Sequence, residues 1–183
     1  IKFTYSHTHS GPALRECLQD YYAWDDAARD RVAQYTLALE KAIVEKIASA
    51  MGNMSDATIW ATEGTADFAV NRRNNDESQI DKLLARGEPL KGPVDHRVPL
   101  LAVRGSDGRL RAVVFGYACH TSMLALYEWS GDYAGFSQLA LEEKHPDLQA
   151  MFYQACGGDQ AAMPQRTVEL TRKNGLTLAA AVE

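Results

Sequence analysis

The chain has 183 residues, of which 46% are hydrophobic and 23% are charged, and its formal net charge at pH 7 is -5. This length suffices for one domain, or for a large part of one, with a substantial buried core. The excess of acidic residues argues against nucleic acid as the main partner, because phosphate binding needs clustered Lys and Arg, and no apolar run is long enough to span a membrane.

The first predicted element is the stretch 1–5, whose β-branched and aromatic residues are typical of a buried strand. Side chains two residues apart share one face of a strand, so a strand that continues to His9 places the imidazoles of His7 and His9 side by side at its end. Ser10-Gly11-Pro12 then turns the chain away. Neutral imidazole is the commonest metal ligand, so this pair favours half of a zinc site. The alternative is that both histidines only cap a sheet or bond to backbone.

The rest of the chain alternates between predicted helices and predicted strands. Apolar residues three and four positions apart indicate the helices, and short alternating or β-branched stretches indicate the strands. In chain order we predict a helix over 26–50, a strand over 57–63 ended by Gly64, a short helix over 80–85, strands over 98–103 and 110–117, a helix over 136–144 capped by Asp132, a strand over 149–155, and a helix over 167–182 interrupted by Asn174-Gly175.

The strands 98–103 and 110–117 flank the turn signal Ser106-Asp107-Gly108 and should pair antiparallel. We therefore expect an α/β protein with a mixed β-sheet flanked by helices. Polar residues follow three of the predicted strands directly, with His120 after the strand 110–117 and a Gly-Gly-Asp-Gln turn over 157–160 after the next one. Because ligand sites in α/β sheets gather at strand ends, we expect the functional site there.

Two further groups of residues allow a structural interpretation and a functional one, and the cysteines have a structural interpretation. Arg72 lies in a polar stretch typical of an exposed loop, but a guanidinium also suits a substrate carbonyl or carboxylate. A set of apolar side chains lies over 124–129 and comprises Leu124, Leu126, Tyr127 and Trp129. These side chains either line a surface that accepts lipid or pack in a core or loop. The three cysteines form no Cys-x-x-Cys pair and are predicted to be free buried thiols; they are Cys17, Cys119 and Cys156.

Five motifs follow one another from the first residues to about residue 160. They are His7-Thr8-His9-Ser10-Gly11-Pro12, Asn71-Arg72, Gly116-Tyr117-Ala118-Cys119-His120-Thr121, Ser130-Gly131-Asp132-Tyr133-Ala134-Gly135-Phe136 and Gly157-Gly158-Asp159-Gln160. In this order they resemble the neutral/alkaline (non-lysosomal) ceramidases. The resemblance implies that residues 1–183 are part of a single catalytic domain of a bacterial-type relative, a fragment truncated at both ends.

The resemblance also implies an activity and a set of site residues. The family's activity is a zinc-dependent hydrolysis of the N-acyl amide bond of ceramide, by an activated water, to a fatty acid and a sphingoid base. By resemblance His7 and His120 bind Zn²⁺, and His9 and Arg72 are the catalytic residues of the substrate site. The family's other zinc ligands, a glutamate and a tyrosine, are expected outside these residues. The family further implies a secreted or periplasmic location and allows peripheral contact with a membrane.

The Gly-Asp turn departs from the family pattern, which has a serine two residues after Asp. Ala161 stands at that place, so a mechanism that needs the serine is in doubt for this chain. We expect Asp159 and Gln160 to bind substrate, with Gln160 bonding to it in place of the serine. Two alternatives remain: a zinc hydrolase of another N-acyl or amide substrate, and a catalytically inactive binding relative.

Overall fold

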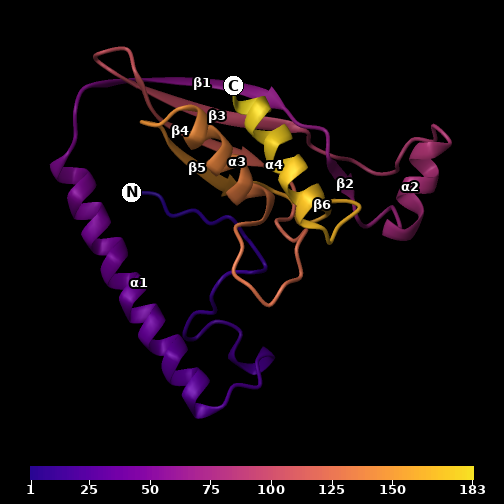
Figure 1. Ribbon diagram of the computed structural model, residues 1–183, viewed down its shortest axis with the longest axis horizontal. Coiled ribbons are helices and arrows are strands. Elements are labelled where there is room, and N and C mark those ends of the chain that lie inside the picture. The colour runs from indigo at the N-terminus through magenta and orange to yellow at the C-terminus, as the bar shows by residue number, and fades with distance from the viewer. The chain divides into compact units, whose positions relative to one another are not determined.

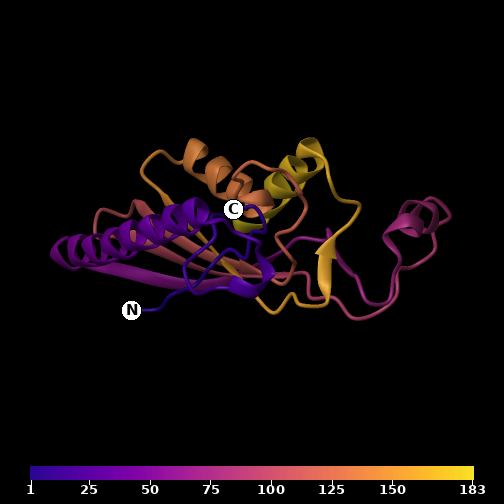
Figure 2. The same ribbon diagram turned by 90° about the horizontal axis from the view of Figure 1, so that it is seen from below.

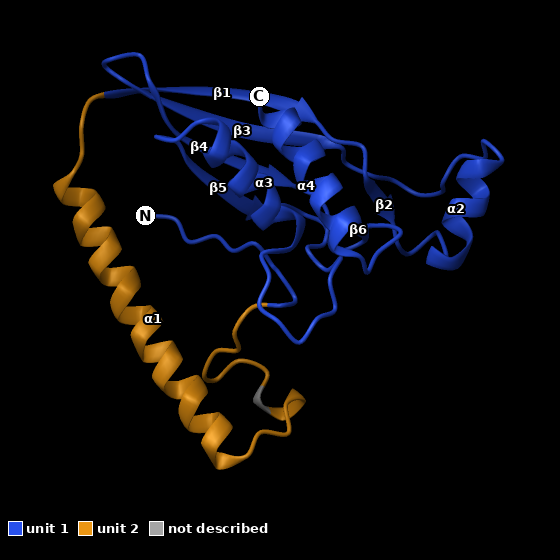
Figure 3. Ribbon diagram, in the orientation of Figure 1, with its two compact units in different colours: residues 1–10, 57–183 blue, residues 11–56 orange. Residues whose placement is uncertain are grey.

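A computed structural model describes the backbone of residues 1–183 and the side chains of all of them except residue 19. The chain divides into two units, which are coloured separately in Figure 3. Unit 1 comprises residues 1–10 and 57–183, and unit 2 comprises residues 11–56.

Unit 1 contains both β-sheets and three of the helices (Figure 1). Its elements are β1 (Ala57–Thr65), β2 (Ala69–Asn71), α2 (Glu77–Ala85), β3 (Arg97–Gly105), β4 (Leu110–Tyr117), α3 (Asp132–Lys144), β5 (Gln149–Gln154), β6 (Gln160–Ala162) and α4 (Val168–Val182). Unit 2 contains a short 3-10 helix (Gln19–Tyr21) and the long helix α1 (Asp26–Gly52), which confirms the helix predicted from residue 26.

The main sheet has the strand order β1-β3-β4-β5. The pairs β1–β3 and β3–β4 are antiparallel and the pair β4–β5 is parallel, so the predicted mixed sheet and its hairpin are confirmed. Helices α3 and α4 pack against each other and cover one face of this sheet (Figure 2). The core lies between these two layers, and its largest fully buried side chains include Tyr117, Tyr133, Phe115, Leu141 and Leu178.

The predicted buried strand over 1–5 is wrong. These residues belong to no strand, and the side chains of Phe3 and Tyr5 are exposed. One hydrogen bond of 3.0 Å, from the amide of Gln154 to the carbonyl of Tyr5, holds the segment beside the end of β5. His7 has φ of 58°, a left-handed conformation that ends any strand alternation before His9.

Two glycines that were expected to interrupt elements instead lie where α4 packs closely. Strand β1 continues through Gly64, where a Cβ would collide with the backbone of Ala181. Helix α4 continues through Gly175, where a Cβ would lie 2.5 Å from the Cβ of Phe136 in α3. Both glycines therefore permit close approach of neighbouring elements, and neither breaks its own element.

Two smaller expectations are also corrected. Asp132 is the first residue of α3 and not its cap, because the helix begins four residues earlier than predicted. All three cysteines are free, as expected, but only Cys119 is buried, and Cys17 and Cys156 are exposed. Within the part of the chain that the structure describes, no helix has the length and apolar character needed to cross a membrane.

Candidate metal centre

The two-stranded sheet formed by β2 and β6 brings distant motifs to one place. Ala161 of β6 forms a parallel bridge with His120, and the amide of His120 donates a bond of 2.8 Å to the carbonyl of Gln160. The amide of Arg72, which directly follows β2, donates a bond of 2.8 Å to the carbonyl of Asp159. His120, Arg72 and the Gly-Asp turn thus converge, although 86 residues separate Arg72 from Gly158 along the chain.

The segment with the first two histidines lies against the residues that follow β4. The amide of His9 donates a bond of 3.2 Å to the carbonyl of Thr121, and the hydroxyl of Thr121 donates one of 2.5 Å to the carbonyl of Ser6. These bonds place His7 and His9 beside His120. The predicted gathering of the histidines at strand ends is therefore present, although the N-terminal segment is not itself a strand.

The three imidazoles form one cluster. The Nε2 atoms of His7 and His120 lie 3.1 Å apart, and the ring centroid of His9 lies 5.2 Å from that of His7 and 5.3 Å from that of His120. One nitrogen from each ring lies within 4.8 Å of the others, so the group can hold a metal ion. Zn–N bonds of about 2.0–2.1 Å in a tetrahedral site separate two nitrogens by about 3.3 Å, which fits the His7–His120 distance.

His120 is oriented by a bond on the far side of its ring. Its Nδ1 lies 2.8 Å from the carbonyl oxygen of Gly157, and because a carbonyl only accepts, Nδ1 donates and Nε2 keeps its lone pair. Burial lowers the pKa of His120, and the nearby Arg72 acts in the same direction, while the bond to Gly157 opposes both. The ring therefore presents a neutral Nε2 to the cluster, the form that binds a metal.

The electrostatic environment of His9 is similar. Burial lowers its pKa most, and the neighbouring His7 and Arg72 lower it further. At neutral pH the imidazole of His9 is uncharged. It can accordingly serve either as a third metal ligand or as a group that takes up and releases a proton beside the other two histidines.

Arg72 is half-buried and points into this site. Its Nε and Nη2 donate bonds of 3.2 and 2.8 Å to the carbonyl of Gly158, and Nη2 lies 3.5 Å from Nε2 of His120. Arg72 lies in a turn, as the loop interpretation expects, but its side chain is only partly exposed and its guanidinium contacts the cluster. The guanidinium places a fixed positive charge at the edge of the histidine cluster.

The two residues predicted to bind substrate contact the site through their backbone carbonyls, which accept bonds from the amides of Arg72 and His120. Gln160 is 5% exposed, and its side-chain oxygen accepts a bond of 2.8 Å from the amide of Asp95. Asp159 is half-buried and accepts a bond of 3.3 Å from the side chain of Asn71. Their role in substrate binding stays a prediction. Ala161, at the place of the family's serine, is fully buried.

Asn71, the first residue of the Asn71-Arg72 motif, has a structural role in this site that the motif alone did not indicate. Its side-chain oxygen accepts bonds of 3.0 and 3.1 Å from the amides of Arg73 and Asn74, and its side-chain nitrogen donates one of 3.0 Å to the carbonyl of Pro93. Asn71 thereby shapes the turn that aims Arg72 at the histidines. The preference of Asn for such turns was the signal available in the sequence.

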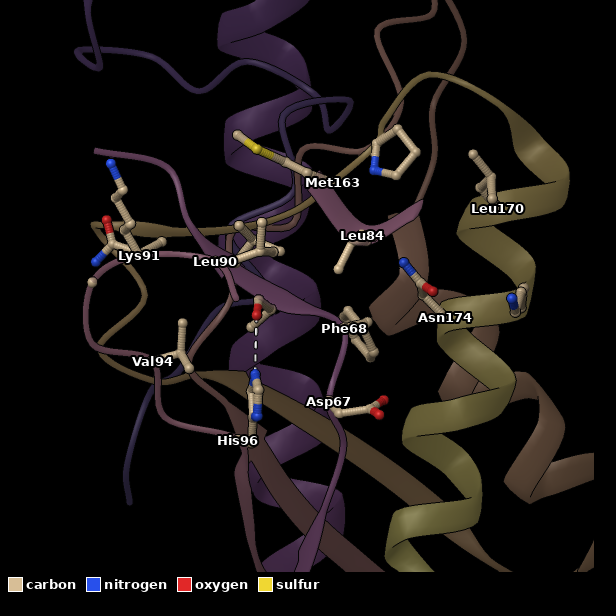
Figure 4. Close-up of a pocket in the computed structure, with 16 residues that line it drawn as sticks. Asp67, Phe68, Leu84, Leu90, Lys91, Val94, His96, Met163, Leu170 and Asn174 are labelled. Atoms are coloured by element: carbon tan, nitrogen blue, oxygen red, sulfur yellow. Dashed lines mark hydrogen bonds between the residues drawn. The ribbon is translucent and has the colours of Figure 1, made fainter. Parts of the chain in front are cut away.

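A separate cavity of about 410 Å³ lies between β2, the residues before β3 and α4 (Figure 4). Its size is in the range of small-molecule sites. None of the three clustered histidines lines it, and its rim carries charges of both signs, from Lys91 and Asp67. Nε2 of His96, on the wall of the cavity, donates a bond of 3.0 Å to the carbonyl of Ala69, so this nitrogen already has a hydrogen-bond partner within the protein. The cavity selects no particular ligand chemistry.

No family model matches the sequence, and no curated protein matches it. Solved structures that are similar to this chain include two ceramidases. One is the neutral ceramidase from Pseudomonas aeruginosa, with a TM-score of 0.63 and 18% identity over 80% of this chain. The other is a ceramidase complexed with C2, with a TM-score of 0.71 and 17% identity over 97% of this chain.

The shared feature is the fold. The resemblance expected from the five motifs is confirmed at that level, because structural likeness at 17–18% identity shows the fold alone. The chain spans 25% of the length of the first structure and 29% of the second. What these ceramidases bind and hydrolyse therefore enters only as a proposal for this chain.

Proposed function

We propose that residues 1–183 form part of the catalytic domain of a zinc-dependent amidohydrolase that cleaves the N-acyl amide bond of ceramide to a fatty acid and a sphingoid base. The observation that carries this proposal is the cluster formed by His7, His9 and His120, built at strand ends within a fold shared with ceramidases. A sheet protein does not need a cluster of three imidazoles and an arginine for its stability. The presence of this cluster therefore favours a catalytic site.

His7 and His120 are the proposed zinc ligands. A Zn²⁺ ion bound by these residues would lower the pKa of a bound water to about 7 and polarise a carbonyl, which are the two requirements of amide hydrolysis at neutral pH. His120 contributes a lone pair whose direction is fixed by the bond from its Nδ1 to Gly157. The lowered pKa of His120 keeps that lone pair free of a proton at neutral pH.

His9 and Arg72 are the proposed catalytic residues. The imidazole of His9 lies beside the other two rings and has a lowered pKa, so at neutral pH its free nitrogen can accept the proton of the attacking water and then pass that proton to the leaving amine. The guanidinium of Arg72 is held by Gly158 next to the cluster, where it stabilises negative charge that develops on the substrate's carbonyl oxygen. In this proposal Asp159 and Gln160 shape the substrate's surroundings.

A second candidate keeps the zinc chemistry and changes the substrate to another N-acyl or amide compound. It is favoured by Ala161, which leaves no hydroxyl at the buried position bridged to His120. A product assay that compares ceramide with short N-acyl amines separates the two substrates. A protein that binds both without hydrolysing either would instead be an inactive relative.

We also propose that the loop after the site contacts a lipid surface. Leu124 is buried, but Leu126, Tyr127 and Trp129 are exposed, Trp129 by 77%. Exposed aromatic side chains favour the interface between lipid headgroups and water. A secreted or periplasmic location belongs to the same proposal. Sedimentation with phosphatidylcholine vesicles tests the contact, and the double variant Tyr127→Ser, Trp129→Ser should sediment less than the wild type.

The experiment that tests the proposed function is a measurement of zinc per chain by plasma mass spectrometry on the full-length protein. We expect near-stoichiometric zinc that is lost in His120→Ala. His145→Ala is the matched control, because His145 lies at the end of α3 beside Glu183, away from the cluster. Wild-type protein without zinc would overturn the hydrolase proposal. Zinc-loaded protein that releases no fatty acid from ceramide would leave the second candidate.

A further inference from the structure

The segment that carries His7 and His9 belongs to no helix or strand, so its position depends on individual hydrogen bonds. The hydroxyl of Thr8 donates a bond of 2.7 Å to the carbonyl of Ser130, and the amide of Ser130 donates one of 3.0 Å to the carbonyl of Ser10. Together with the bonds to Thr121, these contacts fix the segment to two places in the chain: the residues just after His120, and Ser130.

Asp132 joins these two places. Its Oδ2 accepts a bond of 2.9 Å from the amide of Leu124, and its own amide donates one of 3.0 Å to the hydroxyl oxygen of Ser130. Its Oδ1 accepts a bond of 2.8 Å from the amide of Tyr133. The carboxyl group is 1% exposed, so these bonds are made away from water and are hard to replace.

The first turn of α3 does not by itself require this arrangement. Asp132 has φ of 56°, in the left-handed region, whereas helical residues have φ near -63°. A non-glycine residue in that region, together with a buried carboxyl group, is unfavourable unless the surrounding contacts compensate. His7, at the other end of the same set of bonds, also has a left-handed φ. Two such residues in one network point to a constraint on the site.

We propose that Asp132 is a positioning residue that holds the His7–His9 segment against the residues following His120 and so sets the spacing of the three imidazoles. Asp132 touches none of the three histidines, and its effect passes through Leu124 and Ser130. The consequence for zinc affinity rests on the proposed function, whereas the consequence for the position of the segment does not. The two parts are therefore tested separately.

Hydrogen exchange of the metal-free full chain, followed by mass spectrometry, tests the positioning. Asn tolerates the left-handed conformation, but in Asp132→Asn only one of the two acceptor atoms remains, and the amide nitrogen faces a backbone N–H. We expect the amides of His9 and Leu124 to exchange at least about tenfold faster than in the wild type. Unchanged exchange at His9 would overturn the proposal.

Three further variants separate positioning from general loss of stability. Asp132→Gly removes the strain of the left-handed φ but also removes both carboxylate oxygens, so it should likewise accelerate exchange at His9. Exchange at the wild-type rate in this variant would show that the carboxylate does not hold the segment. Ser130→Ala removes only the acceptor for the amide of Asp132, and it provides a milder test that leaves α3 intact. Ser137→Ala is the matched control, since Ser137 is buried in the same helix and its hydroxyl bonds, among the described residues, to Ala134 of that helix.

Zinc affinity, measured by competition with a chromophoric chelator, tests the consequence for the cluster. We expect Asp132→Asn to weaken zinc binding about 10–100-fold and Ser137→Ala to leave it unchanged. Equal affinity in Asp132→Asn and wild type would overturn the claim that Asp132 sets the imidazole spacing. Accelerated exchange at His9 in a protein whose wild type binds no zinc would support the positioning role and reject the proposed function.

Discussion

The Nδ1 of His120 donates a hydrogen bond of 2.8 Å to the carbonyl oxygen of Gly157, 37 residues further along the chain. Gly157 is buried, and a Cβ at this position would lie 2.6 Å from the backbone nitrogen of Cys119. Only glycine allows this approach without a shift of backbone. The direction of the His120 lone pair therefore depends on the absence of a side chain at Gly157.

The variant Gly157→Ala should therefore displace the turn from the end of β4 and turn the ring of His120. We expect zinc affinity to fall about tenfold or more, as for other changes to a ligand's supporting bond. Gly158→Ala is the matched control, because a Cβ at Gly158 has nothing within 4 Å. Both variants are compared by chelator competition. Equal affinities of the two variants would contradict this dependence on Gly157.

Arg72 offers a test of the catalytic assignment. Arg72→Lys keeps the positive charge but cannot donate from both Nε and Nη2 to the carbonyl of Gly158. We expect kcat to fall roughly 10²-fold, with zinc content retained and a smaller change in KM, because in the proposed mechanism Arg72 stabilises a charge that develops in the transition state. The neighbouring Arg73 is exposed, and Arg73→Lys is the control. A change in KM alone would assign Arg72 to substrate binding.

Most of the fold could be predicted because its elements follow from local patterns. The hairpin of β3 and β4 shows alternation around a turn signal, and α1 shows a regular apolar spacing. Gly64 and Gly175 misled the prediction, since each is required by an element distant in sequence. The stretch 1–5 misled it for a related reason: apolar and β-branched composition is not sufficient for a strand that lacks a full ladder partner.

The site could be predicted in its residues but not in its construction. His7, His9, His120 and Arg72 lie in recognisable motifs, and the structure brings them together. The backbone brings His7 and His9 to the site in a different way from the one predicted, because His7 has a left-handed conformation in place of the expected strand alternation. Some of the supporting contacts join residues more than 100 positions apart, such as Thr8 and Ser130, and no local pattern contains them.

The histidine cluster should also affect the pH dependence of folding. Burial is the main cause that lowers the pKa of His9 and of His120 below the usual value of 6.5. Just below pH 6.5 the unfolded chain therefore binds more protons than the folded protein, so the free energy of unfolding decreases as the pH falls. Above this window both states carry neutral imidazoles, and this contribution to stability is fully present.

Urea denaturation in EDTA at several pH values between about 5 and 8 measures this effect. We expect the wild type to lose stability below about pH 6.5, and His120→Gln, which cannot be protonated at that position, to lose less. EDTA removes metal that would otherwise compete with protons for the imidazoles. Identical pH profiles of the two proteins would show that His120 does not contribute in this way.

Tyr117 supports the other side of the site through its hydroxyl group. The hydroxyl donates a bond of 2.6 Å to the carbonyl of Ala66 and accepts one of 3.1 Å from the amide of Ala69, the first residue of β2. The side chain is fully buried. Tyr117→Phe would leave both backbone groups without this partner, so we expect the free energy of unfolding to fall by about 1–3 kcal/mol.

The control for this variant is Tyr153→Phe. Tyr153 lies on the neighbouring strand β5 and is partly exposed, so loss of its hydroxyl should change the free energy of unfolding by less than about 0.5 kcal/mol. Both values are obtained from urea denaturation. Because β2 leads directly to Arg72, a large loss of stability in Tyr117→Phe alone would show that the strand aiming the guanidinium is held from within the core. Equal small losses in both variants would mean that β2 is held by its pairing with β6 and the bond from His96 without a large contribution from Tyr117.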